Sequence, residues 1–225
     1  MSDDATVTIT ATDGVAISAF EARPEGMPKG GIVVLQELFG VNPHIRSVCR
    51  GFAREGYVAL APALFDRIRP GIELGYGPDA IQTGLAARDH LPLKHALADV
   101  QAAIDHLRPF CRVGVVGYCW GGTLAFLAAA RLSGLSAAVG YYGSMIPDYH
   151  SEAPRVPLML HFGASDHTLP PERVALVEKS RPDAQLFVYE AGHGFNCEER
   201  PSFDRVSAGL ARARTLELFE AAVAQ

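Results

Sequence analysis

Gly117-Tyr118-Cys119-Trp120-Gly121-Gly122 is the stretch of this sequence that decides the fold. It follows the apolar run 113–116, which predicts a buried strand, and it precedes the run 123–132, which predicts a buried helix. The motif is therefore a strand, a tight turn and a helix, with a nucleophilic side chain at the apex. Such a turn strains its apex residue, and only glycine leaves room on both flanks. The electropositive end of the following helix favours the thiolate of Cys119, which is its reactive form.

The composition of the 225 residues is that of an ordinary globular protein, with 48% apolar residues and a net charge of -5. The length fits one α/β domain that covers residues 1–225. The sequence shows no basic stripe interleaved with aromatic residues, so we expect no nucleic-acid partner. The acidic, polar N-terminus predicts no signal peptide, and no apolar run approaches the ~18 residues of a membrane span. We therefore expect a cytoplasmic protein without a membrane partner.

The cysteines are Cys49, Cys111, Cys119 and Cys197. Their spacing contains no CxxC pair, which argues against a zinc knuckle or a thioredoxin motif. In a reducing compartment we expect free thiols. Cys49 and Cys111 are interpreted as core residues, because a free cysteine packs as a small hydrophobic residue. Cys119 differs because of its place at the turn, where we expect it to be partly exposed.

Strand patterns and helix patterns alternate along the chain. We expect strands at residues 6–12, 15–22, 31–35, 57–61, 113–116, 137–142, 157–162 and 185–189. We expect helices at residues 42–55, 79–88, 94–108, 123–132, 171–179 and 203–223. Asp13-Gly14 predicts a hairpin between the first two strands. The alternation that follows predicts an α/β fold: a mostly parallel, doubly wound sheet with an N-terminal antiparallel hairpin and helices on both faces.

Two helices show a clear apolar face. In the helix 94–108 it is formed by Leu97, Val100, Ile104 and Leu107. In the helix 203–223 the expected stripe is Val206, Leu210, Ala213, Leu216, Phe219 and Val223. The segment 62–93 has a weaker pattern, and we expect it to lie over the functional site as a lid or a pocket wall.

Four polar side chains each follow a different predicted strand: Glu37, Cys119, Asp166 and His193. In a sheet of this kind, sites form beyond the carboxyl ends of the strands. The order Cys119, Asp166, His193 is the nucleophile, acid, histidine order of the α/β-hydrolase fold. A thiol attacks an acyl carbon, the imidazole takes and returns a proton, and the carboxylate fixes the imidazole tautomer. The sequence therefore predicts a Cys-His-Asp triad.

The backbone N–H groups of Leu38 and Trp120 are the expected oxyanion donors, since one follows the nucleophile and the other lies on the loop after strand 31–35. Simpler interpretations exist for single residues: Asp166 could be a turn residue and His193 a loop residue. Their combination in this order favours catalysis.

A metal site can be imagined from His161, Asp166, His167 and His193. His161 falls inside a predicted strand, however, and His167 is expected to face solvent. We therefore expect no metal and no cofactor.

Three stretches of the sequence resemble the dienelactone hydrolase family. They are Gln36-Glu37-Leu38-Phe39-Gly40-Val41-Asn42, Gly117-Tyr118-Cys119-Trp120-Gly121-Gly122 and Ala191-Gly192-His193-Gly194-Phe195. The resemblance covers nearly the whole chain and implies an α/β-hydrolase fold. It implies hydrolysis of an enol-lactone, such as 4-carboxymethylenebut-2-en-4-olide to maleylacetate. It further implies that Glu37 contacts the resting thiol and helps to activate it when substrate arrives.

The family's lactonase binds the substrate carboxylate with two arginines that this chain lacks. Ile81 and Leu85 stand near the position of one arginine, and Cys197 stands at the position of the other. The candidate substrate-binding residues are Arg67, Arg69, Phe39 and Phe195, with Arg200 as a further arginine that could substitute.

Glu37 is predicted to lie where solvent is scarce, so it needs a partner. The two candidates are the Cys119 thiol, which would make Glu37 a gate on the nucleophile, and a nearby arginine, which would make it a residue that holds the loop.

These features favour a cysteine-dependent hydrolase that acts on a small-molecule lactone or ester, as a monomer or small homo-oligomer. One alternative is a redox-active thiol protein, against which the absence of a recognisable resolving cysteine counts. The other is a non-catalytic binding module on a hydrolase fold, against which the presence of all three triad residues counts.

Overall fold

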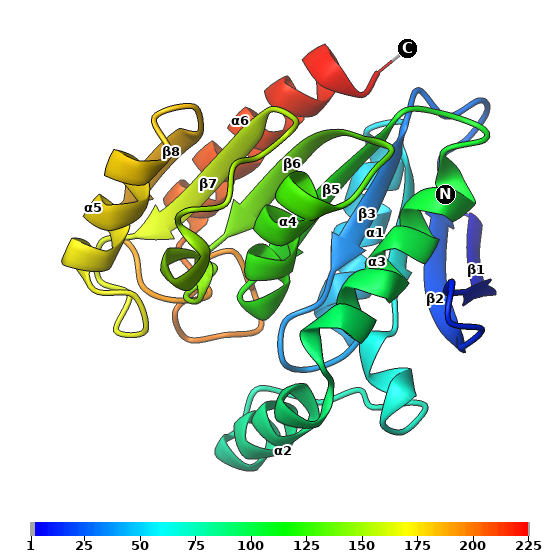
Figure 1. Ribbon diagram of the computed structural model, residues 1–225, viewed down its shortest axis with the longest axis horizontal. Coiled ribbons are helices and arrows are strands. Elements are labelled where there is room, and N and C mark those ends of the chain that lie inside the picture. The colour runs from blue at the N-terminus through cyan, green and yellow to red at the C-terminus, as the bar shows by residue number, and fades with distance from the viewer. Residues whose placement is uncertain (1–2, 225) are drawn as a thin grey trace.

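The computed structural model describes residues 3–224 and contains an eight-stranded sheet (Figure 1). The strands are β1 (Asp3–Thr10), β2 (Ala16–Arg23), β3 (Gly31–Leu35), β4 (Val58–Pro62), β5 (Val113–Tyr118), β6 (Leu135–Tyr141), β7 (Leu158–Gly163) and β8 (Gln185–Tyr189). The α-helices are α1 (Pro43–Arg54), α2 (Pro78–His90), α3 (Leu93–Leu107), α4 (Trp120–Arg131), α5 (Pro171–Ser180) and α6 (Arg205–Ala222). Two short 3₁₀ helices, η1 (Leu64–Arg67) and η2 (Ile146–Tyr149), were not expected from the sequence.

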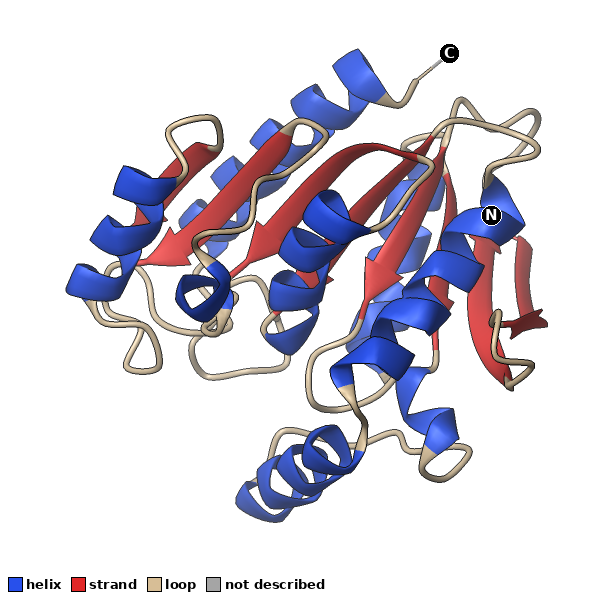
Figure 2. Ribbon diagram, viewed as in Figure 1, coloured by secondary structure: helices blue, strands red, loops and turns tan. Residues whose placement is uncertain are grey.

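The strands lie in the order β1-β2-β4-β3-β5-β6-β7-β8. The hairpin strands β1 and β2 are antiparallel, β2 pairs antiparallel with β4, and the strands from β4 to β8 are parallel (Figure 2). Strands β3, β4 and β5 are buried along their whole length, as central strands of a parallel sheet should be. The structure confirms the predicted fold class.

Helices cover both faces of the sheet. Figure 1 shows α3 and α4 in front of the sheet and α1 and α6 behind it, while α2 lies beyond the carboxyl edge. Since the parallel strands all end at that edge, the loops that follow them gather there. The predicted face of α3 is correct, because Leu97, Val100, Ile104 and Leu107 are buried. Among the described residues, no helix has both the length and the apolar character that crossing a bilayer requires.

The predicted stripe of α6 is wrong in its first half. Val206 and Leu210 are 71% and 49% exposed. The buried face is instead formed by Ser207, Ala208, Ala211, Thr215, Leu218 and Phe219. Small side chains let the start of this helix lie close to its neighbours, so the largest apolar residues do not mark the contact face there.

Arg67 links three separate segments at the end of η1. Its guanidinium donates to both oxygens of Asp99 on α3 at 2.7 Å, and to both oxygens of Asp13 in the β1–β2 turn at 2.8 and 3.0 Å. The side chain of Asp99 is fully buried and that of Arg67 is 8% exposed. The sequence-based assignment of Arg67 to substrate binding is therefore a misassignment, because two carboxylates already occupy its donors.

Replacing Arg67 by methionine should destabilise the protein strongly, because it leaves the buried carboxylate of Asp99 without its partner. Breaking a buried pair in this way costs about 3–5 kcal/mol. Urea unfolding measures the free-energy change. Arg69→Met is the matched control, since Arg69 is exposed and should change stability by no more than about 0.5 kcal/mol. Equal effects of the two substitutions would contradict the role given to Arg67.

Candidate active site

Cys119 stands at the turn between β5 and α4 in a strained backbone conformation. Its φ is 53° and its ψ is -116°. Among the described residues other than glycine, only Cys119 and Tyr142 have a positive φ. The Cys119 N–H donates to the Tyr141 carbonyl at 3.0 Å, and the Cys119 carbonyl accepts from Gly122 at 2.9 Å. These bonds fix the turn. Cys119 is buried, with 9% of its surface exposed, so the partial exposure expected from the sequence is not found.

The glycines of the turn are required by backbone contacts. A Cβ at Gly117 would lie 1.9 Å from the Gly121 carbonyl oxygen. A Cβ at Gly121 would lie 2.5 Å from the carbonyl oxygens of Leu35 and Gln36. The predicted reason for these two glycines is therefore correct, and the second contact packs the start of α4 against the end of β3.

Asp166 and His193, which follow β7 and β8, form a hydrogen-bonded pair. Nδ1 of His193 lies 2.7 Å from Oδ2 of Asp166. Both residues are buried. Thr168 donates to Oδ1 of Asp166 from its backbone N–H at 2.8 Å and from its hydroxyl at 2.7 Å. The carboxylate is thus held by three donors, and Nε2 of His193 is the ring nitrogen left for the thiol.

The charged form of His193 is favoured by its neighbours. Burial opposes the imidazolium, but the charge of Cys119 and hydrogen bonds to Asp166 and Cys119 raise the pKa of His193 to about 10. Burial likewise opposes ionisation of Asp166, yet its bonds to His193 and Thr168 hold its pKa below the ordinary value. His193 therefore contacts both Asp166 and the Cys119 thiol.

The two expected oxyanion donors belong to segments that are far apart in the sequence. Trp120 is the first residue of α4, and Leu38 follows β3. Within residues 3–224, neither N–H donates to a backbone carbonyl outside the helices and strands. The side chain of Gln36 helps to hold the loop that carries Leu38, because its Oε1 accepts a hydrogen bond from the Leu64 N–H at 3.1 Å.

Glu37 is fully buried and has two partners. Its Oε2 accepts from the Tyr76 hydroxyl at 3.1 Å, and its Oε1 accepts from Arg200 at 3.3 Å. Within the described residues no hydrogen bond joins Glu37 to the Cys119 thiol. The arrangement favours the interpretation in which Glu37 pairs with an arginine and holds the loop.

The other candidate substrate-binding residues differ in how far they are buried. Phe195 has no exposed surface, because it packs among Tyr141, Tyr142 and Tyr189. That position does not fit direct contact with a substrate. Phe39 is also buried and stacks edge-on against Tyr76 at 4.6 Å. Arg69 is exposed beyond η1.

Segment 62–93 contacts the oxyanion loop directly. Leu74 N–H donates to the Phe39 carbonyl at 2.8 Å, and a Cβ at Gly84 would lie 2.1 Å from the Leu38 carbonyl oxygen. The segment therefore forms a wall against this loop, which agrees with its expected position.

Three residues near the site were missed by the sequence analysis: Thr168, Tyr76 and Tyr142. Thr168 follows Asp166 by two residues, a spacing at which an Asp carboxylate often accepts from the backbone N–H, so it could have been found. Tyr142, with a φ of 37°, lies with its ring 5.1 Å from that of His193. Its buried hydroxyl has no partner within the described chain. Tyr76 lies in a segment without a clear pattern and carried no signal.

His161 and the cysteines other than Cys119 are all buried. His161 is fully buried between Tyr189 and Thr215, at 2.9 and 3.1 Å, and burial lowers its pKa to about 3. His167 is exposed, as expected. Burial raises the pKa of the thiols of Cys49 and Cys111, and raises that of Cys197 to about 11.

Comparisons with known proteins found similar chains over most of this sequence. The model of the dienelactone hydrolase family matches residues 17–223. Carboxymethylenebutenolidase 1 of Cupriavidus pinatubonensis is 34% identical over 222 residues, which cover 94% of each chain. A carboxymethylenebutenolidase of a Pseudomonas species is 37% identical, covering 84% of this chain and 83% of the relative. The crystal structure of a candidate dienelactone hydrolase from Klebsiella pneumoniae has a TM-score of 0.87 at 29% identity and covers 97% of this chain and 98% of its own.

Iodoacetamide at neutral pH should label Cys119 well before the other three thiols. His193 contacts the Cys119 thiol and can accept its proton, whereas Cys49, Cys111 and Cys197 are buried with raised pKa values. Peptide mass spectrometry locates the label, and the unfolded protein should label at all four positions. In His193→Ala the labelling of Cys119 should slow about tenfold or more, since the group that accepts the proton is lost. An unchanged labelling rate in that variant would contradict the role of this contact.

Thr168→Val should lower kcat by roughly tenfold, because Asp166 loses a hydroxyl donor to its charged oxygen. The substitution keeps the size of the side chain and the backbone N–H bond. Thr168→Ser is the control, since it restores the hydroxyl and should recover most of the rate. Steady-state hydrolysis of an aryl ester provides the measurement. Equal rates in the valine and serine variants would remove Thr168 from the catalytic support.

Proposed function

The chain belongs to the dienelactone hydrolase family and is a hydrolase that acts on ester bonds, and we propose that it cleaves lactones or small esters by nucleophilic attack of Cys119. The single observation that carries this proposal is the line of contacts from Asp166 through His193 to the thiol at the strained turn. The curated relatives named carboxymethylenebutenolidase support the choice of a lactone as substrate.

The reaction proceeds through a thioester. The Cys119 thiolate attacks the acyl carbon, and the carbonyl oxygen gains the negative charge of a tetrahedral intermediate. The N–H groups of Leu38 and Trp120 donate to that oxygen. When the intermediate collapses, the carbon–oxygen bond of the lactone breaks, and the imidazolium of His193 protonates the leaving oxygen.

Hydrolysis of the thioester restores the enzyme. Neutral His193 takes a proton from water as the water attacks the acyl carbon, and the second tetrahedral intermediate expels the Cys119 thiolate. The product carboxylic acid leaves, and the imidazolium–thiolate pair is present again. Asp166 keeps Nδ1 of His193 protonated throughout, so that Nε2 exchanges the proton in both steps.

The charge that the substrate can carry depends on the nearby arginines and not on the residues that carry out the proposed reaction. Arg67 is bound by Asp13 and Asp99 and lies outside the site. Arg200 is the arginine beside Glu37, and that carboxylate already offsets its charge. The proposed substrates therefore extend from the carboxylated dienelactone of the named relatives to neutral lactones and small esters.

Asp166→Asn should lower kcat by about 10⁴ while KM changes little, because the wrong imidazole tautomer disables proton transfer but not binding. Cys119→Ala should abolish turnover of both an activated aryl ester and an enol-lactone. Asp183→Asn, at a half-exposed surface carboxylate, is the control and should leave both parameters unchanged. Turnover by Cys119→Ala at the wild-type rate would exclude this mechanism and leave a binding module or a redox thiol as the function.

A further inference from the structure

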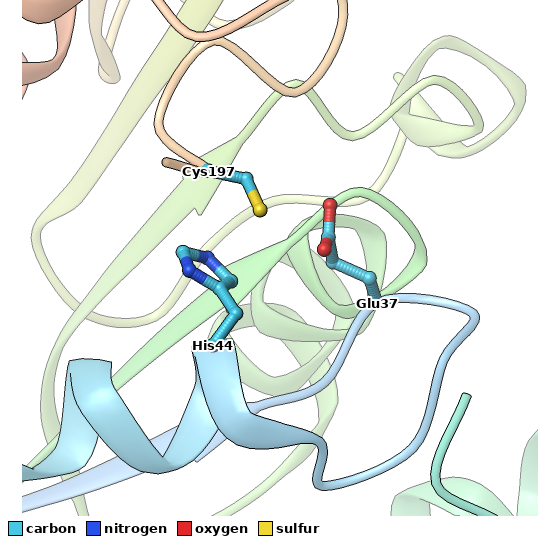
Figure 3. A group of neighbouring side chains, drawn as sticks. All are labelled: Glu37, His44 and Cys197. Atoms are coloured by element: carbon cyan, nitrogen blue, oxygen red, sulfur yellow. The ribbon is translucent and has the colours of Figure 1, made fainter. Parts of the chain in front are cut away.

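Glu37, His44 and Cys197 form a buried cluster of three potential metal ligands (Figure 3). Glu37 follows β3, His44 is the second residue of α1, and Cys197 lies in the loop between β8 and α6. A carboxylate oxygen, a ring nitrogen and the sulfur atom all lie within 4.8 Å of one another. Figure 3 shows the three side chains next to one another, although they come from different parts of the chain.

The imidazole of His44 has an unused nitrogen. His44 is 6% exposed, and its buried Nε2 has no hydrogen-bond partner within residues 3–224. Burying a polar atom without a partner is costly, so this nitrogen is expected to bind something. The carboxylate of Glu37 brings a negative charge to the cluster, and it is already paired with Arg200 at 3.3 Å. A cation bound at the cluster would compete with Arg200 for that charge.

The chemistry of the donors selects the kind of cation. One imidazole nitrogen, one carboxylate oxygen and one thiolate sulfur are the ligand types that zinc accepts together. Magnesium and calcium prefer sites built from oxygen alone. Three protein ligands are enough for zinc, since water can complete a tetrahedral site.

We propose that Glu37, His44 and Cys197 bind a zinc ion, and that its binding modulates the neighbouring active site. Tetrahedral coordination needs ligand atoms about 3.5 Å apart, so the three side chains close by roughly 1 Å around the ion. The thiol of Cys197 releases its proton to solvent when it becomes a ligand.

A cavity on the side of α1 and α6 borders the cluster at His44. It has a volume of about 430 Å³, and His44, Asn196 and Glu198 are among its lining residues. Asn196 and Glu198 flank Cys197 in the chain. Of the three proposed ligands the lining includes His44, and it does not include Cys119.

The coupling to the active site rests on the proposed function and passes through Glu37. The carboxylate of Glu37 pairs with Arg200 and accepts from Tyr76. A zinc ion bound by Glu37 attracts the same negative charge, and this weakens the ion pair between Glu37 and Arg200. The next residue, Leu38, carries an expected oxyanion N–H. Zinc binding is therefore expected to displace that donor and to lower turnover.

The experiment titrates metal-free protein with zinc by calorimetry and counts bound zinc after equilibrium dialysis. Cobalt(II) serves as a second probe, because a bound thiolate gives a charge-transfer absorption in the near ultraviolet. The variants are Cys197→Ala, His44→Gln and, as the matched control, Cys119→Ala. Circular dichroism verifies that each variant is folded, and His44→Gln decides the test if Cys197→Ala does not fold.

The wild type and Cys119→Ala should each bind one zinc ion, and Cys197→Ala and His44→Gln should bind it at least tenfold more weakly. Cobalt absorption should vanish in Cys197→Ala and persist in Cys119→Ala. Binding that is lost in Cys119→Ala but kept in Cys197→Ala would place the ion on the catalytic pair and overturn the proposal. Wild-type binding no stronger than that of Cys197→Ala would also overturn it and leave a hydrogen-bonded cluster only.

Zinc should further inhibit ester hydrolysis by the wild type and should inhibit His44→Gln at least tenfold less potently. Equal inhibition of both would refute the coupling. Because the binding readouts require no turnover, a failure of the proposed hydrolysis would not be mistaken for a failure of the zinc site.

Discussion

The strained turn at Cys119 is the constraint on which the rest of the site depends. A non-glycine residue with a φ of 53° costs about 1–3 kcal/mol. That cost is met only because the backbone of three strands closes around the turn. Tyr141 of β6 accepts from the Cys119 N–H, and Leu35 of β3 leaves no space for a side chain at Gly121. The central sheet therefore has to form in register before the thiol can take its position.

Two separate sets of charges then surround the thiol. On one side, Asp166 and His193 provide a negative and a positive group in line, with Thr168 fixing the carboxylate. On the other side, Glu37 and Arg200 offset one another. The first set supplies the groups that the proposed reaction needs, and in the second set Arg200 offsets the buried charge of Glu37.

The sequence predicted the parts of this site that follow strands, because strand ends fix both position and direction. Cys119, Asp166 and His193 each follow a parallel strand, so their meeting at one edge follows from the topology of a parallel sheet. The sequence did not predict Tyr76 or the role of Arg67, because each is placed by contacts between segments far apart in the chain. The error at α6 has a different cause: a helix that packs through small residues lacks the large apolar stripe by which helices are recognised. The sequence also did not predict that His44 and Cys197 lie together, because they are 153 positions apart in the chain.

Helix α2 has a consequence for how this protein could diversify. Only Gly84 and Ala87 of its thirteen residues are buried, and the close approach of Gly84 to Leu38 anchors the helix next to the oxyanion loop. Residues at its exposed positions can therefore be replaced during selection for new substrates without disturbing the sheet. Gly84 itself cannot, since any side chain there would collide with the backbone of the loop. Substitutions at the exposed positions of α2 should therefore be able to change the substrate range without changing the bond-breaking chemistry, provided that Gly84 is kept.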